Sequence, residues 1–291
     1  MPFISVCPFT NYCAVGPTNK HTLLKACAFG SDGRVFMRIF VLRKRTLLIA
    51  LLIITGIALS IRLTVSEPVS APQRELPIYS VEREDSLISL TFNCAWNDSD
   101  IDDIINTLDN HGVKSTFFIV GDWAEKYPEA VKKLSEAGHE IANHSYNHAH
   151  YSRLSEDAIT ADMDKCDSIL EGLAGKKPFL FRAPYGEYNK TVVRACKKTG
   201  RFCIQWDVDS LDWQKLTAQE ITGRIMDKTQ SGSIILLHNG APHTAEALKI
   251  FLPKLCEKGY KSVPVSQLIY SENYTIDHAG RQIPDKIGKV E

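Results

Sequence analysis

Short apolar runs alternate with amphipathic stretches in strict order between residues 85 and 270, and this alternation restricts the possible folds more than any other feature. The apolar runs have the length of buried strands, and the amphipathic stretches have the periodicity of helices. Strands are predicted over residues 87–92, 113–120, 139–143, 179–182, 202–206, 233–237 and 261–263. Helices are predicted over residues 100–111, 128–137, 155–170, 189–198, 217–229 and 244–257. Such an order favours parallel strands with helical crossovers, so the predicted fold class is α/β.

Seven predicted strands in this order indicate a distorted (β/α)7 barrel formed by residues 85–270. An open, doubly wound sheet is the alternative, but the chain has no Gly-x-Gly-x-x-Gly turn that would accompany a dinucleotide site. Residues 271–291 are polar and are predicted to form a poorly ordered tail.

An uncharged apolar run lies ahead of this domain. It covers residues 46–61, reaches residue 65 if the Arg62 side chain extends to the membrane surface, and directly follows Arg43, Lys44 and Arg45. Basic residues on the amino side of such a run place the amino terminus in the cytoplasm. We therefore expect a transmembrane or signal-anchor helix over residues 46–65, at the cell membrane, with the domain outside the cytoplasm. A cleaved signal peptide and a secreted domain are the alternative.

The segments on either side of the apolar run carry less information. Residues 1–45 are expected to be a cytoplasmic tail, and residues 66–84, rich in proline and charge, a linker. Residues 1–36 show little helical or strand periodicity, and Met37 begins a sequence typical of a signal anchor. We interpret residues 1–36 as an artefact of start-site choice; a short tail is the alternative.

Charge and cysteine content narrow the function classes. The 34 basic residues equal the 34 acidic ones, so no net positive field favours nucleic acid. Three of the eight cysteines precede the apolar run and five follow it, an odd number that leaves at least one thiol free. No Cys-x2-Cys pair suggests a structural zinc site, and the cysteines predict no disulfide framework.

Polar clusters follow five of the predicted strands. His144 and His148 come after the third strand, and neutral imidazoles are frequent ligands of catalytic metals. The other clusters are Asn93, Cys94 and Trp96 after the first strand, Arg182, Pro184 and Tyr185 after the fourth, Asp209, Asp212 and Trp213 after the fifth, and Leu236 and His238 after the sixth. The carboxyl ends of parallel strands open onto one face of a barrel, so these side chains are expected to gather there. His150 is expected to point away from the site.

In these motifs, and over residues 85–270, the chain resembles the NodB-homology polysaccharide deacetylases, carbohydrate esterase family four. The family motifs His-Ser/Thr-x-x-His, Arg-x-Pro-Tyr-Gly, Asp-x-x-Asp-Trp and Leu-x-His are matched by the clusters after the third, fourth, fifth and sixth strands. The resemblance implies a distorted (β/α)7 barrel that removes acetyl groups from sugar polymers. It also implies that the reaction requires a divalent metal, with zinc as the first choice and cobalt or another ion as alternatives. The resemblance further implies that His144 and His148 bind the metal.

The resemblance assigns roles to the remaining motifs. The backbone N–H of Tyr185 would stabilise the oxyanion, and His238 would act as general acid, paired with Asp209 or Asp212, of which we prefer Asp212. Arg182 would orient the base. Trp96 and Trp213 offer flat faces for a sugar ring, and Pro184 and Leu236 complete their motifs.

The cluster after the first strand departs from the family pattern Thr-Phe-Asp-Asp. Asn93 stands where the family has its general base, and an amide cannot accept a proton near neutral pH. Cys94 stands where the family has a carboxylate metal ligand. In one interpretation Cys94 binds zinc through its thiolate. In the other it is a small buried residue that binds no metal.

The expected function is therefore metal-dependent deacetylation of N-acetylated sugars in a cell-wall polysaccharide, with peptidoglycan as the first choice of substrate. Chitin-type oligomers and acetylated xylan are alternatives. Because the base position is altered, a carbohydrate-binding homologue that has lost catalysis is the competing function. A scaffold in envelope assembly is a third, but no apolar stripe for a partner is evident.

Overall fold

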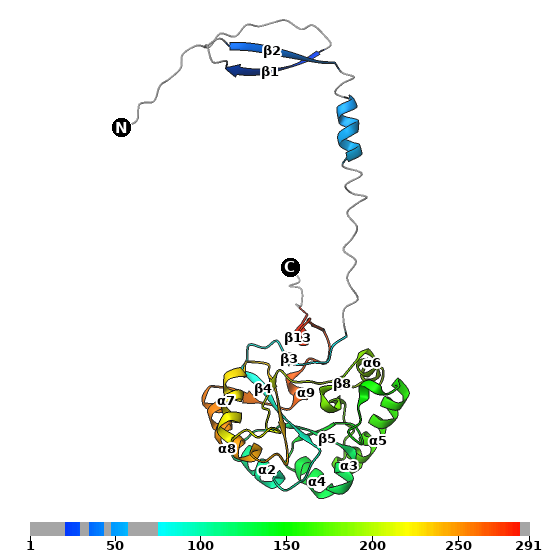
Figure 1. Ribbon diagram of the computed structural model, residues 1–291, viewed down its shortest axis with the longest axis vertical. Coiled ribbons are helices and arrows are strands. Elements are labelled where there is room, and N and C mark those ends of the chain that lie inside the picture. Colours follow the sequence, from blue (N-terminus) through cyan, green and yellow to red (C-terminus); the bar gives the residue numbers. More distant parts are fainter. Residues whose placement is uncertain (1–20, 30–34, 44–47, 58–74, 286–291) are drawn as a thin grey trace, which may run out of the picture. The chain divides into compact units, whose positions relative to one another are not determined.

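The computed structural model describes residues 21–29, 35–43, 48–57 and 75–285 (Figure 1). They belong to two units, Met1–Pro72 and Gln73–Glu291, which we describe separately.

The second unit is built on a curled sheet of parallel strands (Figure 1). In spatial order the strands are β8 (Phe202–Cys203), β7 (Leu180–Phe181), β6 (Glu140–Asn143), β5 (Thr116–Ile119), β4 (Leu87–Cys94), β10 (Ile234–His238) and β9 (Val208–Asp209), with β11 (Lys261–Ser262) also paired to β4. In the described residues this path is open between β8 and β9, where Ile78 bridges to Ile204 of the chain after β8. The α/β class is confirmed, and the curled half-barrel fits the predicted distorted (β/α)7 barrel.

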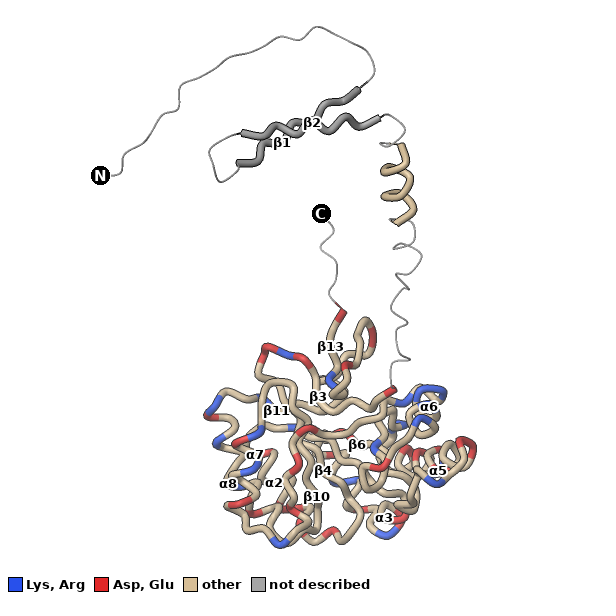
Figure 2. Tube along the Cα trace, turned by 45° about the horizontal axis from the view of Figure 1, so that its top comes forward, with Lys and Arg blue, Asp and Glu red and all other residues tan. Residues whose placement is uncertain are grey.

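Helices cover the outside of the sheet (Figure 1). They are α2 (Ile101–Asn110), α3 (Gly121–Lys126), α4 (Pro128–Glu136), α5 (Glu156–Ala174), α6 (Lys190–Lys198), α7 (Ala218–Lys228), α8 (Thr244–Glu257) and α9 (Val265–Leu268). Short 3-10 turns η1 (Tyr151–Arg153) and η2 (Pro184–Gly186) follow β6 and β7. The expected helices are all present, whereas α3, α9 and β9 were not predicted. Figure 2 shows acidic and basic residues intermingled over these helices, as expected for a chain without net charge.

Strand β4 shows why the site residues face inward. Ile88, Leu90 and Phe92 pack in the apolar layer between sheet and helices. Successive side chains of a strand point to opposite faces, so Ser89, Thr91 and Asn93 face the barrel interior. A second apolar cluster, with Phe118, Ala142 and Ile234 among its members, fills that interior below the site.

A small three-stranded sheet lies at the amino ends of the barrel strands. Its strands are β12 (Tyr274–Ile276), β13 (Arg281–Pro284) and β3 (Ser80–Val81). The N–H of Val81 donates to the carbonyl of Gly232 at 2.9 Å, just before β10 begins. The prediction of a poorly ordered tail is therefore wrong for residues 274–284. Part of the expected linker, from residue 75 onward, is integrated into the barrel unit.

The first unit contains β1 (His21–Phe29) and β2 (Val35–Arg43), which pair antiparallel, and a helix over residues 48–57. Strand β1 lies within residues 1–36, where the sequence shows little strand periodicity. Among the described residues no helix combines the length and apolarity needed to cross a membrane. The rest of the predicted span, residues 46–47 and 58–65, lies outside the described residues.

Candidate active site

A pocket of about 650 Å³ opens at the carboxyl ends of the parallel strands. It is lined by Asn93, Ala95, Trp96, Val120, Asp122, His144, His148, Tyr185, Gly186, Trp206, Asp209, Trp213, Leu236 and His238. All the predicted site residues line it except four. Arg182, Pro184 and Asp212 are buried behind the lining, and Cys94 lies elsewhere.

The turn after β6 brings two imidazoles to the pocket. Ser145 adopts a φ of 72°, and its hydroxyl oxygen accepts a hydrogen bond from the His148 N–H at 2.9 Å. The ring centroids of His144 and His148 are 5.0 Å apart, with the ring planes at 81°. Nδ1 of His144 lies 2.8 Å from the carbonyl oxygen of Arg182 and therefore carries the proton, which leaves a lone pair on Nε2.

Burial favours the neutral form of both imidazoles. It lowers the pKa of His144 well below the usual value, and the neighbouring His148 lowers it further. The pKa of His148 is lowered by burial first and by His238 second. A neutral imidazole offers its lone pair to a cation, so the two rings fit part of a zinc site.

Cys94 is not part of this site, and its prediction as a metal ligand is wrong. As the neighbour of Asn93 on β4 it points to the opposite face, where it packs with Phe92 and Leu90 in the helix-facing layer. Burial raises the pKa of its thiol well above the usual value, so the thiolate is disfavoured. Within the residues that the structure describes, no three His, Cys, Asp or Glu side chains are grouped to hold a metal ion.

Asp122, which the sequence analysis missed, adds a carboxylate to the pocket. It lies in the first turn of α3, shortly after β5, and its negative charge partly opposes the lowering of the His148 pKa. The other site residues were predicted because they follow the carboxyl ends of strands. Asp122 follows the carboxyl end of the second predicted strand and could have been found in the same way.

On another side of the pocket a buried carboxylate orients His238. Asp212 accepts from Nδ1 of His238 at 2.8 Å, from the His238 backbone N–H at 2.7 Å and from the Thr244 hydroxyl at 2.6 Å. The Trp96 ring stacks on the imidazole, with centroids 5.4 Å apart. Asp212, and not Asp209, is thus the partner of His238. This arrangement fixes the ring and leaves Nε2 as the nitrogen available to a bound molecule.

Arg182 is fully buried behind Asn93. One guanidinium nitrogen donates to Oδ1 of Asn93 at 3.0 Å, and the other donates to the carbonyl of Gln205 at 3.1 Å. The guanidinium carbon lies 3.9 Å from the centre of the Phe118 ring. Burial lowers the pKa of Arg182 to about 9, and Asp209 opposes this shift from a distance. A buried charge whose hydrogen-bond partners are neutral amides is costly, since carboxylates are the partners that offset such burial.

Comparison with known proteins shows which family the chain belongs to. A polysaccharide deacetylase family profile matches residues 80–203. A peptidoglycan-N-acetylglucosamine deacetylase of Bacillus cereus is 32% identical over 185 residues, which are 62% of this chain and 67% of that protein. The chain belongs to the polysaccharide deacetylase family.

Two other relatives of this polysaccharide deacetylase homologue are described as an uncharacterized protein and as a pseudoenzyme. The uncharacterized protein YlxY of Bacillus subtilis is 33% identical over 66% of this chain, which spans only 60% of that protein. The crystal structure of a carbohydrate esterase family 4 pseudoenzyme from Bacillus anthracis has a TM-score of 0.65 and 31% identity, covering 68% of this chain and 70% of that one. A mutant of that pseudoenzyme is described as having restored activity.

In this family member Tyr185 is held in an unusual conformation. It has a φ of 59° within η2, which begins at Pro184. Its ring stacks on His150 with centroids 4.3 Å apart and meets His148 edge-on at 4.5 Å. The expectation that His150 points away is therefore wrong. His150 packs beside the site because Glu187 accepts from its Nδ1 at 3.1 Å.

Three aromatic rings surround the pocket of this deacetylase homologue and remain open to solvent. The exposed fractions of Trp96, Tyr185 and Trp213 are 46%, 59% and 52%. In the described part of the barrel unit these are the exposed large apolar side chains, and all three line one pocket. Exposed rings around a polar cleft are suited to the flat faces of sugar rings.

Proposed function

We propose that this protein removes acetyl groups from N-acetylated sugars of a cell-wall polysaccharide, with peptidoglycan as the first substrate. The observation that carries the proposal is one pocket that holds an imidazole oriented by a buried carboxylate, His238 with Asp212, together with the neutral pair His144 and His148. Relatives described as peptidoglycan-N-acetylglucosamine and peptidoglycan-N-acetylmuramic acid deacetylases support the substrate class.

The chain's own residues divide the work as follows in this proposal. His144 and His148 hold a divalent cation, zinc by first choice and cobalt as an alternative. When bound, such an ion polarises the acetyl carbonyl and lowers the pKa of water. The backbone N–H of Tyr185 donates to the oxygen that gains negative charge, and His238 gives its proton to the departing sugar nitrogen. The faces of Trp96 and Trp213 hold the sugar rings.

Asn93 occupies the position of the general base in this proposal, and it limits the rate. Its amide cannot take a proton, so the reaction lacks a contribution that amounts to about 100- to 10,000-fold in enzymes that have one. Arg182, which would orient a carboxylate there, instead donates to the amide oxygen.

A second function, glycan binding without catalysis, is favoured by two observations. The amide at the base position is one, and the similarity to a family pseudoenzyme is the other. The aromatic rings around the pocket serve either function.

We also propose that the barrel acts outside the cytoplasm, tethered at the cell membrane through residues 46–65. This rests on the uncharged run and the basic residues before it. Membrane fractionation of the native protein, followed by amino-terminal sequencing, distinguishes a tethered from a released domain and tests the start at Met37.

The experiment for the main proposal measures acetate released from N-acetylglucosamine oligomers and from peptidoglycan, with the protein loaded with zinc, loaded with cobalt or stripped of metal. We expect slow release that needs metal and is abolished by His144→Ala. Turnover by the rigorously metal-free protein would contradict the mechanism. If the protein binds glycan but releases no acetate at any metal loading, the result would support glycan binding without catalysis and contradict the proposed hydrolysis.

A further inference from the structure

The loop that carries His144 and His148 is fastened from behind by helix α5. It spans residues 143–151, between the end of β6 and η1, and includes two non-glycine residues with positive φ, Ser145 at 72° and His148 at 55°. Positive φ is unfavourable for such residues, so surrounding bonds must hold them in it. Some of those bonds lie within the loop, and the backbone N–H groups of Gly121 and Asp122 in α3 donate to the carbonyls of Ser145 and Tyr146. The others come from two acidic side chains of α5.

The first fastening point is Asp167, which is 1% exposed. Its Oδ1 accepts from the side-chain amide of Asn143 at 2.5 Å, and the oxygen of that amide accepts from the Ser145 N–H at 2.8 Å. The Asn143 amide nitrogen also donates to the carbonyl of Met163 at 2.9 Å. Asp167 is therefore linked to the turn at Ser145 through a single side chain, Asn143, which immediately precedes His144.

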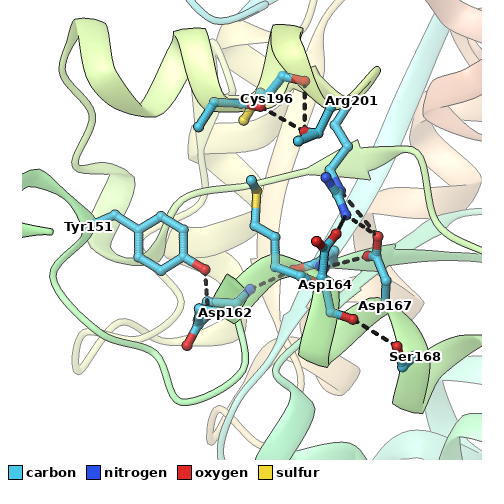
Figure 3. Close-up of polar contacts among 12 residues, drawn as sticks. Tyr151, Asp162, Asp164, Asp167, Ser168, Cys196 and Arg201 are labelled. Carbon is cyan, nitrogen blue, oxygen red and sulfur yellow. Dashed lines mark hydrogen bonds and ion pairs between the residues drawn. The ribbon is translucent and has the colours of Figure 1, made fainter. Parts of the chain in front are cut away.

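Arg201 in turn holds Asp167. Its Nε and one terminal nitrogen lie 3.1 and 2.6 Å from Oδ2 of Asp167, and the terminal nitrogen also reaches Asp164 at 2.5 Å (Figure 3). The two carboxylates differ in a useful way, because Asp167 touches both Arg201 and the loop residue Asn143, whereas Asp164 is half exposed and is bonded to Arg201 on the outer side.

The second fastening point is Asp162. Its Oδ1 accepts from the backbone N–H of Tyr146 at 2.7 Å. The same oxygen accepts from the hydroxyl of Tyr151 (Figure 3). Asp162 thus binds the loop on both sides of His148, two residues before it and three residues after it.

We propose that Asp167 and Asp162 are positioning residues, which act through Asn143 and the loop backbone. They fix the separation of His144 and His148 and keep Nδ1 of His144 against the Arg182 carbonyl that sets its tautomer. The inference rests on the proposed role of the two imidazoles as cation ligands. It extends that role to side chains that touch neither the pocket nor its contents. Groups that orient metal-binding histidines from behind affect metal affinity by about 10- to 100-fold.

The test compares Asp167→Asn with the matched control Asp164→Asn. The carboxylate of Asp167 accepts from Asn143 on one oxygen and from Arg201 on the other, and an asparagine replaces one of those oxygens by an NH2 donor, so one of the two contacts is lost. Asp164→Asn weakens the other ion pair of the same Arg201 without touching the loop. Zinc affinity is measured by calorimetry on folded protein, and we expect a fall of about tenfold for Asp167→Asn and less than twofold for the control.

A second measurement uses the metal-free protein and is therefore independent of catalysis. Nitrogen NMR of the imidazoles reports which nitrogen of His144 carries the proton. We expect Nδ1 to be protonated in the wild type and in Asp164→Asn, and a mixture of tautomers in Asp167→Asn. Should Asp167→Asn fail to fold, the half-buried Asp162→Asn replaces it, with the same expected direction for both measurements.

The outcomes separate the two proposals. Zinc affinity and His144 tautomer unchanged in a folded Asp167→Asn or Asp162→Asn variant overturn the positioning role, because a merely structural ion pair would alter the melting temperature alone. A wild type that binds zinc with the expected differences among variants but releases no acetate supports the positioning role and defeats the proposed hydrolysis.

Discussion

Replacing Asn93 by aspartate tests whether the buried Arg182 is a cation that lacks its carboxylate. The change adds one negative charge at a side chain whose Oδ1 already lies 3.0 Å from a guanidinium nitrogen, and it adds no volume. The variant Asn93→Ala, which removes the acceptor without adding charge, is the matched control.

The magnitude follows from the surroundings of Arg182. Burial lowers its pKa from 12.5 to about 9, which corresponds to about 5 kcal/mol against the charged form. A carboxylate about 4 Å away attracts the cation by about 4 kcal/mol at an effective dielectric constant near 20. The carboxylate itself loses several kcal/mol of hydration, so we expect a net gain of about 1 kcal/mol and a melting temperature about 3 °C higher.

The activity should change more than the stability. A carboxylate at position 93 can accept a proton, which the amide of Asn93 cannot. Acetate release by the zinc-loaded variant should therefore rise about 100- to 10,000-fold. Acetate assays and thermal unfolding are run on wild type, Asn93→Asp and Asn93→Ala, the last of which should be less stable by about 1–3 kcal/mol and gain no activity.

Two results would refute this reasoning. An Asn93→Asp protein less stable than wild type would mean that Arg182 is already adequately neutralised. A stabilised Asn93→Asp protein that releases no more acetate than wild type would mean that the pairing is right but position 93 does not act as a base.

Further changes probe other parts of the site and the fold. Asp212→Asn should lower acetate release at least about 100-fold at unchanged glycan affinity, because His238 loses the carboxylate that orients it; equal rates would exclude that role. Trp96→Ala should weaken binding of an N-acetylglucosamine oligomer about tenfold in calorimetry, and an unaffected affinity would remove this ring from the sugar site. Burial lowers the pKa of His139 from 6.5 to about 4, so the unfolded chain binds a proton that the folded chain rejects, and the free energy of unfolding should fall by about 3 kcal/mol as pH drops from 6.5 to 4. His139→Gln should flatten that dependence in urea titrations, and an unaltered slope would contradict it.

Much of the barrel could be predicted from sequence because its strands and helices have clear periodicity. The short strand Val208–Asp209 and the helix Gly121–Lys126 were missed, since segments of two to six residues carry too little pattern to distinguish them from loops. Residues 274–284 have the polar sequence of a tail, and their pairing with Ser80–Val81 depends on a contact between the two ends of the barrel unit, which are far apart in sequence.

The error at Cys94 has a different origin. The family pattern suggested that adjacent residues 93 and 94 act together, whereas alternation along β4 places one in the pocket and the other against the helices. Asn143 shows the reverse case. Its polarity at the end of a strand gave no hint of function, because its partners Asp167 and Arg201 are distant in sequence.

The small sheet of β3, β12 and β13 determines where anything attached to the barrel must leave it. Residues 80–81 and 281–282 pair there, beside Gly232 and Ser233 at the amino end of β10, whereas the pocket opens at the opposite end of the same strands. A linker attached directly at residue 75 or residue 285 should therefore leave the barrel away from the mouth. A long polymer strand could then lie across that mouth even when the protein is immobilised.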